Sequence, residues 1–193
     1  MMKKMILTAS ILLLIGLLVQ PVWAHVTPNV RLLTTRETVS QLLPKGNLFV
    51  KKVKLTEDQQ KKLNSYDNWR TQVDEFKFYI SRDKQDKLIR SMVSMTQITR
   101  HGPLVVAVAL NPDGTVADAL VTDSMMEPMT WVSPILKSDF MKSFRGRGSD
   151  MSLKLADKWK EQFSGISQDF ARVIANAVKE AAQLYEVVFK SGS

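Results

Sequence analysis

Polar and apolar residues alternate most regularly in the middle of the chain, and this alternation predicts an antiparallel sheet. The segment EFKFYISRD (75–83) places Phe76, Phe78 and Ile80 on one face, at the period-two spacing of a strand. KLIRSMVSMTQITR (87–100) continues the pattern as a second strand. Residues 104–122 form two β-rich runs around Asn-Pro-Asp-Gly (111–114), which is typical of a hairpin. A weaker alternation at 47–55 predicts one more strand.

Helical periodicity flanks this sheet region. Residues 35–43 are predicted to form a helix that ends at Pro44-Lys45-Gly46, and Thr56 with Gln59 forms a capping-box pattern at the start of another. The last helix is predicted over about 169–188, where the apolar positions recur at spacings of three, four and seven. SMMEPMTWVSPI (124–135) is predicted to be irregular because it contains two prolines, and LKSDFMKSF (136–144) to be a short helix. The expected fold is therefore an α+β domain, an antiparallel sheet with flanking helices.

The first 24 residues have the pattern of a secretory signal peptide. Lys3 and Lys4 precede an apolar core, and Val22-Trp23-Ala24 is typical of a cleavage site. The alternative is an uncleaved anchor helix, because the apolar stretch is only slightly short of a bilayer span. The expected organisation is a signal peptide at 1–24, a lead-in with a short helix at 25–47 and the main domain at 48–190. The expected location is periplasmic.

Composition narrows the choice of partner. The chain has no cysteine, so disulfides and thiolate metal sites are excluded. Its formal net charge is +8, and removal of Lys3 and Lys4 with the signal leaves about +6. This charge favours an acidic protein or a membrane surface. Because the basic residues are scattered and the chain is predicted to be exported, nucleic acid is not an expected partner.

Four short segments follow one another in an order that resembles a known family. They are the Asp113-Gly114 turn, Glu127-Pro128, the Phe-rich segment SDFMKSFRG (138–146), and Ser-Gly-Ile-Ser (164–167) before the last helix. The set resembles the FMN-binding domain family. This family occurs in subunits of sodium-pumping quinone reductases and Rnf electron-transport complexes, and in the membrane regulator of nitrous oxide respiration. The resemblance covers roughly residues 48–189 and implies the fold of that domain.

The resemblance also implies a cofactor. In the family, a flavin transferase joins FMN through a phosphoester bond to a threonine, and Ser167 stands at that position. Ile166 replaces the usual alanine, and Glu161 replaces the usual aspartate. The implied function is an exported protein of extracytoplasmic electron transfer, with a membrane or periplasmic redox protein as partner. Its expected cofactor-binding residues are Ser167, Gly165, Ser164, Glu161, Glu127, Met129 and His101.

Several alternatives stay open at the level of sequence. FMN binding at Ser167 could be covalent or non-covalent, or Ser167 could simply cap the helix while Asp169 occupies its positive end. Met125, Met126, Met129 and Trp131 could cover a flavin ring or fill the core. A second function is a degenerate domain that acts as an accessory binding protein. A third is copper handling through an N-terminal His25, with His101 and the thioethers.

No hydrolase or phosphate-loop motif occurs, so any chemistry is expected to belong to a bound cofactor rather than to a catalytic side chain. The resemblance implies an electron-transfer flavoprotein rather than a stand-alone catalyst.

Overall fold

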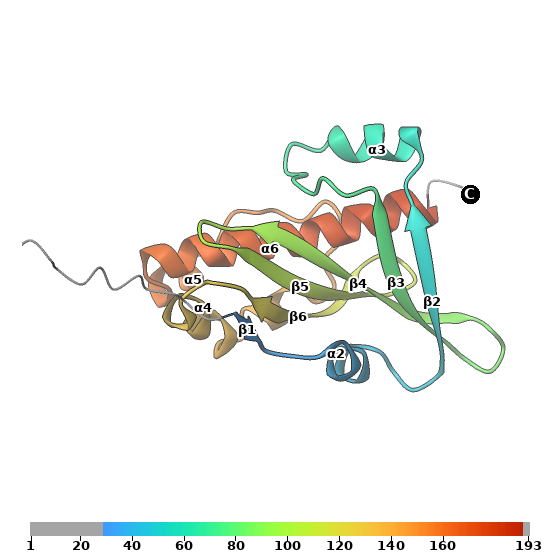
Figure 1. Cartoon of the computed structure of the whole chain (residues 1–193), viewed down its shortest axis with the longest axis horizontal. Helices are drawn as coiled ribbons and strands as arrows, with labels where there is room; N and C mark the ends of the chain where they lie inside the picture. Colours follow the sequence, from blue (N-terminus) through green and yellow to red (C-terminus); the bar gives the residue numbers. More distant parts are fainter. Residues whose placement is uncertain (1–28, 191–193) are drawn as a thin grey trace, which may run out of the picture.

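The computed structural model describes residues 29–190, which form one antiparallel six-stranded sheet with helices on both faces (Figure 1). The strand order is β1-β6-β5-β4-β3-β2. The strands are β1 (Val30–Arg31), β2 (Asn47–Lys54), β3 (Glu75–Arg82), β4 (Leu88–Ile98), β5 (Pro103–Leu110) and β6 (Val116–Ser124). The expected α+β fold with an antiparallel sheet and flanking helices is confirmed.

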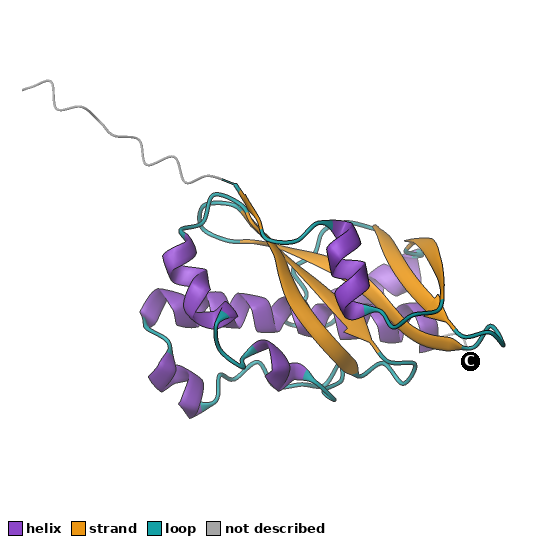
Figure 2. Cartoon of the chain, turned by 90° about the horizontal axis from the view of Figure 1, so that it is seen from below, coloured by secondary structure: helices purple, strands orange, loops and turns teal. Residues whose placement is uncertain are grey.

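One long helix, α6 with 21 residues, stands out among the helical elements of the described chain. They are α2 (Thr35–Leu42), α3 (Glu57–Asn64), α4 (Met129–Leu136), the 3₁₀ turn η1 (Met141–Phe144), α5 (Asp157–Gln162), α6 (Gly165–Tyr185) and the π-helical turn η2 (Glu186–Lys190). α6 crosses one face of the sheet and α2 lies against the other (Figures 1 and 2). The main core therefore lies between α6 and the sheet.

The alternation in the sequence determines which strand residues enter that core. Phe76, Phe78 and Ile80 are all buried, as the period-two pattern predicts, while Lys77 is exposed. The hairpin closes at Asn111–Gly114, where Gly114 has a φ of +81° that an L side chain rarely adopts. The capping box of α3 is present in both directions between Thr56 and Gln59.

The sheet is not evenly paired. β3 pairs with β4 only from Tyr79 to Arg82, whereas it pairs with β2 along its whole length. β4 pairs with β5 from Ser91 to Ile98. The β2–β3 and β4–β5 pairs therefore diverge from a common end, as Figure 1 shows.

The segment predicted to be irregular contains a helix. α4 occupies 129–136 and carries Pro134 inside it, so the prediction from its two prolines was wrong there. Pro128 holds the N-cap position, where a proline costs little because no helical N–H is lost. Val132 and Ile135 are fully buried, and this packing against the main core outweighs the cost of Pro134.

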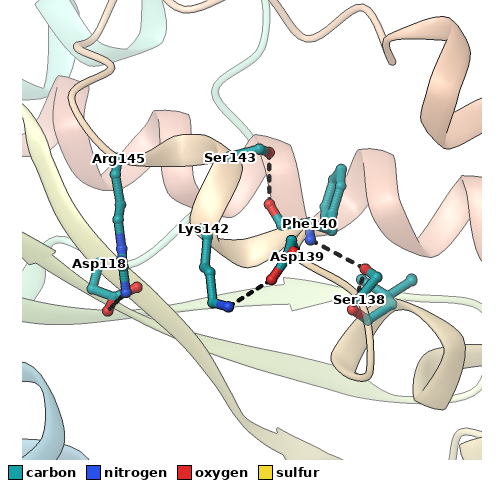
Figure 3. A network of polar contacts seen from close by, with 8 residues as sticks. Asp118, Ser138, Asp139, Phe140, Lys142, Ser143 and Arg145 are labelled. Atoms are coloured by element: carbon teal, nitrogen blue, oxygen red, sulfur yellow. Dashed lines mark hydrogen bonds and ion pairs between the residues drawn. The ribbon is translucent and has the colours of Figure 1, made fainter.

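The segment after α4 forms a compact polar and aromatic turn (Figure 3). Of the short helix predicted over 136–144, residue 136 ends α4 and 141–144 form a single 3₁₀ turn, while 137–140 are not helical. Lys142 Nζ bonds Asp139 at 2.6 Å, and Arg145 reaches across to Asp118 of β6 at 2.6 Å. Phe140 packs edge-on against Phe144, Trp159 and Phe163, so this turn and α5 share one aromatic cluster. α5 was not predicted from the sequence.

β1 and α2 extend the fold beyond the expected main domain. β1 pairs with β6, and Leu42 of α2 is buried in a small second core together with Met92 and two alanines of β5. The predicted signal peptide, 1–24, lies outside the described residues. Within residues 29–190, no helix is both long and apolar enough to cross a membrane.

Candidate functional site

The start of α6 is open and uncapped. Ser164 has the extended backbone of an N-cap residue, with φ −72° and ψ 162°, but its side chain makes no capping hydrogen bond. No acidic residue lies in the first turn. Gly165 is exposed, and a Cβ placed on it would meet no atom within 4 Å. The N–H groups of a first helical turn have no partner within the helix, so this 21-residue helix presents its positive end to an anion.

The helix begins four residues before its predicted start, and this changes the roles of two residues. Ser164, not Ser167, occupies the cap position. Asp169 lies beyond the first turn and bonds Arg172 Nη1 at 2.6 Å. The expectation that Asp169 competes with a phosphate at the helix start was therefore wrong, because the Ser-Gly step already belongs to the cap and first turn.

Ser167 faces the interior. Its residue is only 2 % exposed, and its hydroxyl donates a hydrogen bond of 2.8 Å to the carbonyl oxygen of Trp131 in α4. Neighbouring Ile166 points outward and is 46 % exposed. The hydroxyl therefore joins α6 to α4, and it would have to leave the Trp131 carbonyl before it could attack a flavin donor.

Aromatic rings continue from this junction. The Trp131 ring lies 6.2 Å from that of Phe170 in α6 and 5.4 Å from that of His101, with the second pair tilted by 32°. Trp131 is half-buried and the His101 side chain is 40 % exposed. A row of rings, of which Trp131 and His101 are partly accessible and Phe170 is buried, thus leads from α6 to the turn between β4 and β5.

Glu127 anchors that turn. Its carboxylate is fully buried and accepts a very short hydrogen bond from the Thr99 hydroxyl and one of 2.9 Å from the His101 N–H. The other carboxylate oxygen lies 2.9 Å from His101 Nδ1. Burial alone would raise the pKa of Glu127, but the hydrogen bonds from Thr99 and His101 hold it below its ordinary value of 4.5. The buried carboxylate therefore stays ionised and fixes the orientation of His101.

The structure brings together some of the predicted residues and not others. One chain of contacts joins Ser167, Trp131, His101 and Glu127. Met129 is half-buried at the start of α4, and Met126 is 48 % exposed with a φ of +60°. Glu161 lies exposed on α5, and none of the described hydrogen bonds joins it to residues 164–167.

A second buried carboxylate, Glu180, was not predicted from the sequence. It is fully buried in α6 and accepts from the Arg70 N–H at 2.5 Å, the Thr71 hydroxyl at 2.6 Å and the Gln97 amide at 2.7 Å. Asn176, one turn earlier, donates to it at 3.0 Å. The polar positions 176, 180 and 183 recur at helical spacing on α6, a pattern that could have indicated a polar stripe on this helix but not its partners.

The described residues contain no cluster of metal ligands that would support copper handling. Among residues 29–190, no group of three or more His, Asp or Glu side chains is arranged to hold a metal ion. His25 lies outside the described residues.

Neither models of known protein families nor curated proteins gave a match to this chain. Its function is therefore argued from the site itself.

Proposed function

We propose that this chain is an exported FMN-binding protein of extracytoplasmic electron transfer, which holds the FMN phosphate at the start of α6. The observation that carries the proposal is the open, uncapped first turn at Ser164–Ser167 of a long helix. A helix N-terminus with a glycine at its first position suits a phosphate, because N–H groups and the helix dipole both favour negative charge there. The resemblance to the FMN-binding domain family supports the same site and the same cofactor.

Apolar and aromatic side chains between the helix start and the β4–β5 turn supply the second support. Ile166 is exposed in the first turn of α6, the half-buried Trp131 ring lies against Phe170 and His101, and the exposed Met126 lies beside Gly102. Such side chains suit the isoalloxazine ring, whose redox chemistry is the cofactor's own. The chain's role is then to bind the phosphate, cover the ring and set its surroundings, with a membrane or periplasmic redox protein as the partner in electron transfer.

We propose further that the FMN is held non-covalently in the folded chain. The Ser167 hydroxyl is buried and donates to Trp131, so it is not poised for the reaction that a flavin transferase catalyses. Burial of this one hydroxyl also favours the second candidate function, an accessory binding protein that has lost the flavin.

The test is to express the full chain with its leader in a host that also produces a flavin transferase. The purified protein is then denatured and run on a gel under ultraviolet light. We expect a yellow native protein, flavin released into the supernatant on denaturation, and no fluorescent band. A fluorescent band that Ser167→Ala abolishes would establish the covalent alternative, and a colourless protein unable to take up FMN would favour the accessory function.

The mass of the same protein reports processing, which we expect to leave His25 as the first residue.

A further inference from the structure

The split in the sheet opens a groove that the proposed function does not use. Within the described chain, residues 75–78 of β3 pair with β2 alone, and residues 93–98 of β4 pair with β5 alone. Backbone N–H and C=O groups of a strand point alternately to its two sides. The two stretches therefore present unpaired backbone groups to the space between them, as the edge of a sheet does.

This space is a groove of about 1110 Å³. Residues of β3 and β4 form its two walls. The rest of its lining comes from the loop at 70–73 and from Arg172, Val173 and Asn176 of α6. This volume is slightly above the usual range of small-molecule pockets, about 300–1,000 Å³, so the groove has room for a short stretch of chain.

The β4 side of the groove is held firmly. Gln97 and Asn176 both line it, and both donate to the buried carboxylate of Glu180. The same carboxylate binds Arg70 and Thr71 of the loop. β4, the loop and α6 are thus joined through one buried group, so the free edge of β4 is a preformed template rather than a mobile segment.

The charge of the groove is positive. Arg70, Lys77 and Arg172 line it, against the single carboxylate of Glu75. Arg172 forms an ion pair with Asp169. The described hydrogen bonds of the Arg70 guanidinium go instead to the main-chain oxygens of Asp67 and Trp69, which do not neutralise its charge. Positive charge beside open backbone groups favours an acidic ligand.

Exposed apolar side chains also line the groove. Val73 of the loop is 59 % exposed and Ile98 of β4 is 79 % exposed. These two side chains add apolar contact area to the lining, and burial of that area by a ligand would be favourable.

We propose that the groove binds an extended acidic segment of a partner protein, which pairs with the free edge of β4 at residues 94–98. Main-chain pairing along β4 supplies affinity, while Lys77 and Arg70 select acidic side chains and Val73 and Ile98 select apolar ones. The chain's own first 28 residues are not the occupant, because they contain Lys3 and Lys4 but no Asp or Glu. The proposal does not depend on flavin binding.

The experiment selects random dodecapeptides displayed on phage against the full exported chain. We expect enrichment of acidic sequences with alternating apolar positions. The strongest peptide, made synthetically with a fluorescent label, should bind Lys77→Glu at least about tenfold more weakly and lose affinity as salt is raised. Lys154→Glu makes the same charge change at an exposed site outside the groove and should leave binding unchanged.

Hydrogen exchange distinguishes strand pairing from simple charge attraction. The bound peptide should slow amide exchange within residues 93–98, and proline at alternate peptide positions should abolish binding. The proposal is overturned if no peptide is enriched, if Lys77→Glu and Lys154→Glu bind equally, or if protection appears elsewhere. Enrichment of this chain's own sequences would assign the groove to a second copy instead. Competition by FMN would assign it to the cofactor.

Discussion

At the scale of single residues, two buried carboxylates each hold one loop of the fold in place. Glu127 holds the β4–β5 turn and His101, and Glu180 holds the loop at 70–71 against α6. Each is fully buried and each accepts several hydrogen bonds. Removing such an acceptor leaves buried donors without partners, which costs more than the net value of the bonds themselves.

Glu127 should make the protein sensitive to acid. Its pKa is below 4.5 in the folded protein, so its stabilisation is complete above the unfolded value and disappears as the pH falls through the folded value. Glu127→Gln should lower the free energy of unfolding by about 1–3 kcal/mol at neutral pH. Denaturant titrations should show this difference shrinking below about pH 4.5, as the native glutamate becomes protonated.

The control is Glu161→Gln, an exposed glutamate whose replacement should change the free energy of unfolding by less than about 0.5 kcal/mol. A difference between the native protein and Glu127→Gln that stays constant from neutral pH down to about pH 3 would disprove the assigned role of Glu127.

Glu180 should determine how tightly the loop is held. Glu180→Ala leaves donors of Arg70, Thr71, Gln97 and Asn176 without their acceptor, and should lower the free energy of unfolding by roughly 3 kcal/mol or more. Amide exchange should accelerate first at residues 65–74. Glu180→Gln keeps one acceptor oxygen and should lower the free energy of unfolding by less than Glu180→Ala does. Unchanged exchange in that loop would contradict the role given to this network.

At the scale of elements, the start of α6 carries the functional proposal. Its helix dipole is not offset by an acidic side chain in the first turn. A carboxylate placed at the cap would take the position proposed for the phosphate, while a neutral amide would cap the helix without adding charge.

Ser164→Asp and Ser164→Asn form a matched pair for this element. Both should stabilise α6 as N-caps, to a similar degree of about 1 kcal/mol or less. FMN titrations followed by flavin fluorescence should show at least about tenfold weaker binding for the aspartate than for the asparagine. Equal FMN affinity in the two variants would place the phosphate elsewhere.

Much of the element pattern could be predicted from sequence, for identifiable reasons. Alternation placed Phe76, Phe78 and Ile80 in the core, and Asp113-Gly114 gave the hairpin turn. α4 could not be predicted, because its stability comes from burial of Val132 and Ile135 in spite of Pro134. Long-range packing of this kind leaves no local trace in the sequence.

The candidate site was predictable in position but not in orientation. Sequence located the Ser-Gly-Ile-Ser turn at the start of the last helix. It could not reveal that the Ser167 hydroxyl faces Trp131, because that contact joins residues 36 positions apart. For the same reason it could not pair Glu180 with Arg70, Thr71 and Gln97, which are distant in the chain and adjacent only in the fold.

At the scale of the whole molecule, two separate features would serve a protein that works with partners. In Figure 1 the start of α6 lies with α4 and α5 at one end of the molecule, and β3 diverges from β4. The groove lies between these two strands. A net charge of +8 on the full chain favours acidic partners over basic ones. An exported electron carrier with a flavin at one place and a partner's segment at another is consistent with both features.

The most direct test of the central claim compares FMN with riboflavin, which has the same ring system but no phosphate. Isothermal titration of the purified, flavin-free chain measures both affinities under one set of conditions. If the start of α6 binds the phosphate, FMN should bind at least about tenfold more tightly than riboflavin, and Ser164→Asp should remove that advantage. Equal affinities for the two flavins, or no binding of either, would contradict the proposal.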